Sequence, residues 1–205
     1  MRWIARATVA AAGLGLIAAS TMTASAQQPG RIRGQIEKVD GPTLVLKTRD
    51  GGTVNVKLAD DARVAGLNKA TLADIKDDTF IGIAGMPEAD GTIKAFSIHI
   101  FLPAQRGVVP ERHGPWDAKT GSTMTNAVVG AKVGGKDGET LTVKYKEGEK
   151  KVVVGPDTVI AAVAPGNKDE LKPGAQIIIM ASEKQADGSI VAKNLYVGRG
   201  LTPAM

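Results

Sequence analysis

The sequence predicts an all-β fold of two tandem, small five-stranded OB-like barrels, related by an internal repeat and containing little helix. The first observation behind this prediction is a repetition. The segment at 39–47 returns at 136–144, and the segment at 89–95 returns at 186–192, in both cases 97 residues later (136 − 39 and 186 − 89). A repeated set of hairpins indicates two copies of one small β-domain.

The second observation is alternation of apolar and polar residues in the first copy, predicted at 27–101. Val54, Val56 and Leu58 alternate with polar neighbours, which is the period of a half-buried strand. Asp-Gly pairs before and after such runs are typical of hairpin turns, because both residues tolerate positive φ. The segment 59–78 is less strand-like, and its apolar spacing predicts one or two helical turns that close a barrel end.

The second copy, with a short tail, is predicted at 126–205. Leu141, Val143 and Tyr145 alternate with polar residues, and the run 177–179 is continuous isoleucine, as in a buried strand. Each copy then contains a meander of three strands, a short insert and a hairpin of two strands. That order is similar to an OB-type barrel.

Residues 1–26 have the features of a cleaved signal peptide. Arg2 and Arg6 precede an apolar run at 9–19, and small residues end the segment at Ala26. We therefore expect cleavage near Ala26 and a periplasmic or secreted protein. No later window approaches the roughly 18 apolar residues of a membrane-spanning helix, so no membrane span is expected in the mature chain.

Composition narrows the function classes. The chain has no cysteine, which removes thiolate metal sites and thiol catalysis. The formal net charge of +5 falls to +3 when Arg2 and Arg6 leave with the leader, and the charges are interspersed rather than clustered. Nucleic acid is not an expected partner. Its single strands bind in grooves that place clustered basic residues beside aromatic side chains for base stacking, and the charges of this chain are interspersed.

We expect no catalytic residue, no cofactor and no enzymatic activity. Beyond the leader there are two histidines, His99 and His113, and no Gly-x-Ser-x-Gly elbow. Alternation places His99 opposite Ile98 and Ile100, which predicts a solvent-facing strand histidine. A hydrolase acting on an envelope polymer remains a further alternative, since triads assemble in space rather than in sequence.

No metal ligand is assigned, because the sequence has no His-x-x-x-His pair and no EF-hand loop. A composite site of His99, His113 and Asp117 would form if the linker between the copies folded back on the first one. A divalent metal is therefore kept as a possible partner.

The linker at 102–125 is rich in proline, glycine and arginine and has no periodicity. Connections of this length are often functional or disordered. Its Arg112, His113, Trp116 and Asp117 are the candidate partner-binding residues. Ligands commonly bind between domains, so we expect the cleft between the barrels to meet an envelope protein, a polymer or a small ligand.

The turn and core residues that carry a resemblance lie at 34–41, 44–46, 50–51, 73–76, 80–82 and 90–93, and in the second copy at 137–138, 141, 171–174 and 187–188. They resemble the OB-like repeats of small exported bacterial proteins classed as a domain of unknown function. The second copy departs from this pattern at 176–178.

Some members of that group carry labels that link them to metal transport. They share a Trp-Asp pair and a segment similar to the one at 121–127. The resemblance implies, as an alternative function, a soluble accessory protein of a metal transport system, and not a permease. The residues themselves predict an exported, non-enzymatic binding or envelope-associated module.

Overall fold

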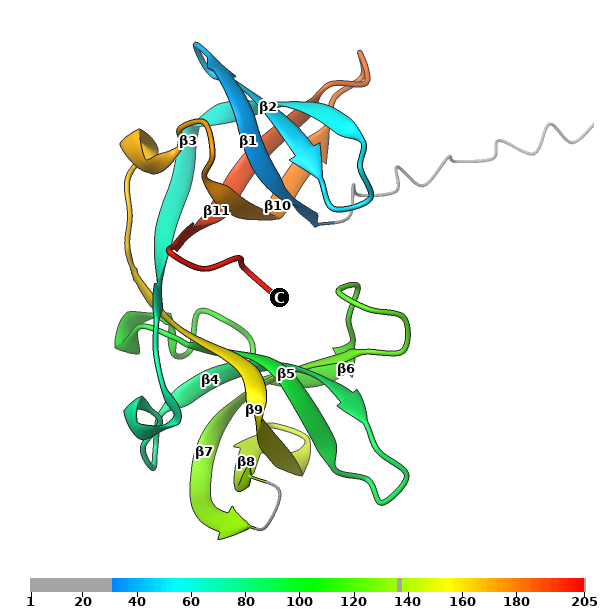
Figure 1. The fold of residues 1–205 in the computed structure, drawn as a ribbon, viewed down its shortest axis with the longest axis vertical. Helices are drawn as coiled ribbons and strands as arrows, with labels where there is room; N and C mark the ends of the chain where they lie inside the picture. Colours follow the sequence, from blue (N-terminus) through cyan, green and yellow to red (C-terminus); the bar gives the residue numbers. More distant parts are fainter. Residues whose placement is uncertain (1–30, 136–137, 205) are drawn as a thin grey trace, which may run out of the picture.

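The computed structural model describes residues 31–135 and 138–204, which form an all-β protein (Figure 1). The predicted signal peptide at 1–26 lies outside these residues. No helix in the described part of the chain is long and apolar enough to cross a membrane. The strands are β1 (Ile32–Asp40), β2 (Thr43–Thr48), β3 (Thr53–Lys69), β4 (Phe80–Pro87), β5 (Ile93–Ile100), β6 (Arg112–Pro115), β7 (Thr123–Gly135), β8 (Gly138–Tyr145), β9 (Gly148–Pro165), β10 (Gln176–Lys184) and β11 (Ile190–Arg199), with short 3-10 helices η1 (Leu72–Asp74), η2 (Pro103–Gln105) and η3 (Lys168–Glu170).

Two barrels of five strands are present, and both close. The first barrel consists of β1, β2, β3, β11 and β10, with β10 pairing back onto β1. The second consists of β7, β8, β9, β5 and β4, with β4 pairing back onto β7. In each barrel three strands form a meander and a hairpin completes the wall through one parallel pair, β3–β11 or β5–β9. The prediction of an all-β fold built from small five-stranded barrels is confirmed.

The predicted domain boundaries are wrong in one respect: the halves at 27–101 and 126–205 do not each make a barrel. The first barrel takes β1–β3 from the first half and β10–β11 from the second, and the second barrel takes β7–β9 and β4–β5. The halves thus exchange their C-terminal hairpins. Figure 1 shows β3 and β9 running between the two barrels.

The exchange has a local cause in β3. Within the segment predicted to be less strand-like, β3 continues to Lys69. Residues 65–69 pair with the end of β9, while 63–68 also pair with β11 of the first barrel. Leu67 lies opposite Val163 at the middle of this antiparallel crossing, 96 residues apart (163 − 67). Gly166 makes the close approach possible, because a Cβ there would lie 2.8 Å from the backbone nitrogen of Gly66.

Each barrel has its own apolar core, and both halves of the chain contribute to it. In the first barrel Leu46 and Val56 share a cluster with Leu195 from β11. The residues after the 3-10 turns close the barrels from the end: Ile75, after η1, is buried in the core of the second barrel, and Leu171, after η3, in that of the first. The helical turns predicted within 59–78 are therefore present as the single 3-10 turn η1, and η3 occupies the corresponding insert of the second half.

The barrels also pack on each other. One apolar cluster between them joins Trp116 and Ala84 to Ile178 of β10, and another surrounds the crossing of β3 with β9. The linker supplies part of this contact through Trp116, which follows β6, and β6 is anchored to the second barrel by pairing with β7.

The strand exchange predicts how a nicked chain behaves. A protease site inserted between Gly107 and Val108, a loop where the Val108 side chain is 74% exposed, separates the two halves covalently. We expect the fragments to stay associated and to co-elute in size-exclusion chromatography until urea unfolds them, because each barrel needs strands from both. Fragments that separate while each remains folded would contradict the exchange.

Candidate functional site

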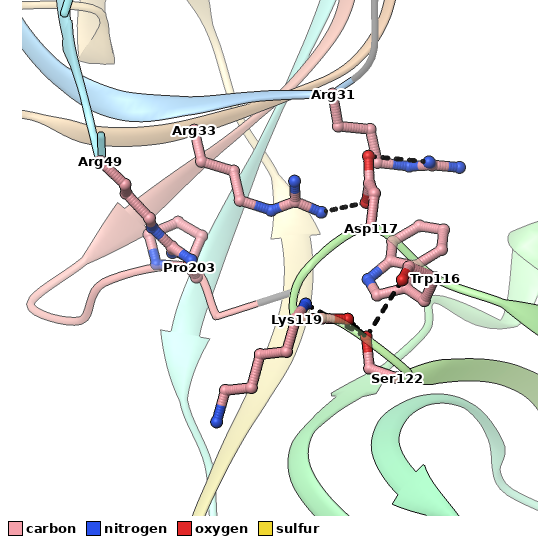
Figure 2. Close-up of polar contacts among 8 residues, drawn as sticks. All are labelled: Arg31, Arg33, Arg49, Trp116, Asp117, Lys119, Ser122 and Pro203. Atoms are coloured by element: carbon pink, nitrogen blue, oxygen red, sulfur yellow. Dashed lines mark hydrogen bonds and ion pairs between the residues drawn. The ribbon is translucent and has the colours of Figure 1, made fainter. Parts of the chain in front are cut away.

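The loop between β6 and β7 places Trp116 between the barrels. The Trp116 backbone N–H donates to the carbonyl oxygen of Ser122 at 2.8 Å. The Ser122 Oγ lies 2.7 Å from the Lys119 carbonyl oxygen, and Gly121 supplies the positive φ of 76° that the turn needs. The loop is thereby fixed by its own hydrogen bonds, and its Asp117 side chain points to Arg31 and Arg33 of the first barrel (Figure 2).

The Trp116 side chain is buried rather than exposed to solvent. It is 7% exposed and contacts Met124 on the second barrel and Ile178 on the first. The guanidinium carbon of Arg31 lies 3.7 Å from the centre of the indole ring, a cation–π contact with the first barrel. Trp116 therefore joins the barrels.

Asp117 adds a charged contact to the same junction. Its carboxylate accepts hydrogen bonds from the Nη2 of Arg33 at 2.7 Å and the Nη1 of Arg31 at 3.4 Å (Figure 2). Partial burial raises the pKa of Asp117, but the hydrogen bonds and charges of Arg33 and Arg31 outweigh it and hold that pKa below its ordinary value. Two arginines thus share one carboxylate.

A cavity of about 750 Å³ opens next to this junction. The volume lies within the roughly 300–1,000 Å³ of small-molecule sites. Its walls come from both barrels and from the linker. The larger apolar lining residues are Val64, Phe101, Leu102, Val108, Val109, Trp116, Met124, Val163, Met180 and Leu195.

His99 lies in the wall of this cavity, and the prediction that it faces solvent is wrong. Its side chain is 2% exposed, and its ring centre lies 6.0 Å from that of Tyr196 on β11. The alternation rule failed because the outer face of β5 is covered here by the first barrel instead of by water. Burial lowers the pKa of His99 to about 3, so the imidazole is neutral near pH 7.

Two other polar groups in the cavity are already hydrogen-bonded to the protein. The Nδ2 of Asn126 donates to the Pro110 carbonyl oxygen at 3.1 Å, and the Nε2 of Gln105 donates to the Tyr196 hydroxyl at 3.3 Å. His99 is different: within residues 31–135 and 138–204 no hydrogen bond to its side chain is present. It is available to a ligand as a neutral donor or acceptor.

The four predicted partner-binding residues fall in different places. Arg112 and Trp116 line the cavity, while Asp117 lies beside it on the arginines. His113 does not line it: its Nδ1 lies 2.8 Å from the Thr125 Oγ1, and its ring is 6.0 Å from that of Tyr145. Burial, together with the charge of Lys150, lowers the pKa of His113.

The composite metal site of His99, His113 and Asp117 is not formed. The described residues contain no group of three or more histidine, cysteine or acidic side chains close enough to hold a metal ion. The linker does fold back, but it brings Asp117 to the first strand, where arginines occupy the carboxylate.

Several residues of the cavity gave no signal in the sequence. Arg31 sits at the start of the first strand, more than 80 residues from Trp116, and Arg63 lies in the segment with no clear strand pattern. Met180 and Tyr196 read as ordinary strand residues. Only knowledge of the strand exchange places these side chains on one wall.

Burial of His99 predicts a pH dependence of stability. Below its ordinary pKa of 6.5 the unfolded histidine takes up a proton that the folded one refuses until about pH 3, so acid favours unfolding. We expect the free energy of unfolding to fall by up to about 1.4 kcal/mol per pH unit between pH 6 and pH 5, and His99→Gln to remove most of this slope. Urea titrations across pH measure it.

His113→Gln is the matched control. The pKa of His113 is also lowered, but the ring is only half-buried, so its replacement should remove less of the slope. Equal slopes in the wild-type and His99→Gln proteins would contradict the burial of His99 in its neutral form.

The packing of Trp116 predicts a structural cost for its removal. Trp116→Ala should lower the free energy of unfolding by about 3–5 kcal/mol, because it deletes a buried indole. Asp117→Asn should cost about 1 kcal/mol or less, because Asp117 is 38% exposed and its ion pairs are screened. Chemical denaturation followed by circular dichroism compares the two, and a reversed order would contradict the packing role.

Comparison with known proteins gives no relative to transfer a function from. No family model matches the chain, and no curated protein or solved structure is significantly similar to it. The resemblance to exported OB-like repeats stays a prediction, and the function has to be inferred from the geometry of the site.

Proposed function

We propose that this protein is an exported, non-enzymatic binding module that holds a small, largely apolar molecule between its two barrels. The leader-like segment at 1–26 supports export to the periplasm or the medium. The inter-barrel cavity supports the binding role.

The observation that carries the proposal is the make-up of that cavity. It encloses about 750 Å³, its walls are mainly aliphatic and aromatic, and a few polar groups converge on it. This combination is typical of small-molecule sites, where apolar walls supply affinity and polar groups fix orientation. The junction of Trp116, Arg31 and Asp117 holds the two walls at a fixed separation and so supports a preformed site.

The two alternatives have less support. Within the described residues no cluster of metal-ligating side chains exists for a metal-handling accessory role. For a hydrolase, the buried His99 would need a nucleophile and an orienting acid within hydrogen-bond reach, and its side chain makes no such bond in the described part of the chain.

A neutral fluorescent probe tests the proposal. N-phenyl-1-naphthylamine is apolar, and its fluorescence increases when it leaves water. We therefore expect its fluorescence to rise and saturate as the protein binds it, with one site per chain. Ala104→Trp, on η2 in the cavity lining, should weaken binding at least about tenfold by filling the space.

Ala186→Trp is the matched control. Ala186 is exposed in the turn between β10 and β11 and does not line the cavity, so its replacement should leave probe binding unchanged. Absence of saturable binding, or equal affinity in the Ala104→Trp and wild-type proteins, would refute a ligand site between the barrels.

A further inference from the structure

The charges around the cavity have one sign. Arg31, Arg63 and Arg112 line it, and no described aspartate or glutamate does. Arg31 and Arg33 share the Asp117 carboxylate, whereas neither Arg63 nor Arg112 has an ion-pair partner among residues 31–135 and 138–204. The cavity therefore carries positive charge that the protein itself does not neutralise.

The positive groups and the apolar walls occupy different depths. Arg63 and Arg112 are exposed, whereas Met124, Val163 and Leu195 are buried. His99, the buried histidine of the wall, is uncharged near pH 7. The site thus has a charged outer edge and a neutral, mainly apolar interior.

The positive charge of Arg31 is disfavoured by its surroundings. Burial lowers its pKa, Asp117 acts in the opposite direction, and the nearby charges of Arg33 and Arg112 lower it further. An anion placed among these guanidinium groups would relieve their mutual repulsion and accept charge-assisted hydrogen bonds.

We propose that the ligand is a free amphiphile with one anionic end group, whose alkyl chain fills the inter-barrel cavity and whose carboxylate or phosphate lies at its arginine edge. This inference rests on the proposed binding function and adds the charge and orientation of the ligand. The arginines hold the end group, the aliphatic walls hold the chain, and His99 is a neutral hydrogen-bonding group within the site.

The test compares decanoate with decanol, which share an apolar chain and differ in charge. Each competes against N-phenyl-1-naphthylamine on the full mature chain. We expect decanoate to bind at least about tenfold more tightly, with the preference shrinking as salt is raised. Arg63→Gln combined with Arg112→Gln should bring the affinity for decanoate down to that for decanol.

Arg106→Gln is the matched control. Arg106 is an exposed arginine paired with Asp78, its Nη1 3.1 Å from the carboxylate, and it does not line the cavity. The preference for decanoate should persist in this variant. If Arg106→Gln removed it as fully as the double variant did, general positive charge rather than the arginine edge would be responsible, and the inference would be wrong.

Other outcomes separate this inference from the proposed function. Equal affinity for decanoate and decanol, with the probe still bound, would overturn the anionic ligand and leave the binding module intact. If neither the probe nor either competitor bound, the binding function itself would fall. Flotation with phosphatidylglycerol vesicles without decanoate binding would overturn the free amphiphile in favour of a membrane surface.

Discussion

The antiparallel crossing of β3 and β9 is the constraint on which the rest of the structure depends. Because both strands continue through the crossing at Leu67 and Val163, neither half can fold back on its own meander. Each barrel is then completed by the hairpin of the other half. Gly166 allows the backbones to approach closely enough for this, since a Cβ at that position would collide with the backbone of Ala65 and Gly66 on β3.

The cavity between the barrels results from that crossing. The crossing fixes the two barrels side by side, so that β5 of one and β11 of the other face each other through His99 and Tyr196. Faces that would contact water on isolated barrels become the walls of one shared cavity. The linker then closes part of this space, because Trp116 packs against both barrels and Asp117 pairs with the first strand.

The sequence was sufficient to predict the strands, but it did not predict which strands pair with one another. Alternation at Val54, Val56 and Leu58 and the repeated Asp-Gly turns predicted the strands and the barrel type. They did not predict the exchange, because alternation specifies which face of a strand is buried and not which copy of a repeated hairpin covers it. The two hairpins present similar apolar faces, so both pairings satisfy the same local pattern.

For the candidate site, too, the sequence predicted residues with a local signal and missed residues placed by contacts between distant segments. Arg112 and Trp116 were found from the unusual length and composition of the linker, a local signal. Arg31 and His99 depend on contacts between distant segments, and His99 was misassigned because the rule applied to it assumes water on one side of the sheet. Residues whose environment is made by the inter-barrel contact lie beyond what local periodicity specifies.

The exchange also has a consequence for the order in which the chain acquires structure. β1 pairs with β10, so the first barrel closes only when residues near the far end of the chain have arrived. Until then a three-stranded meander presents unpaired backbone at its edges, which is the form in which β-proteins associate wrongly. Contacts this distant in sequence slow folding. The edges of β1 and β3 in particular stay unpaired until β10 and β11 are in place.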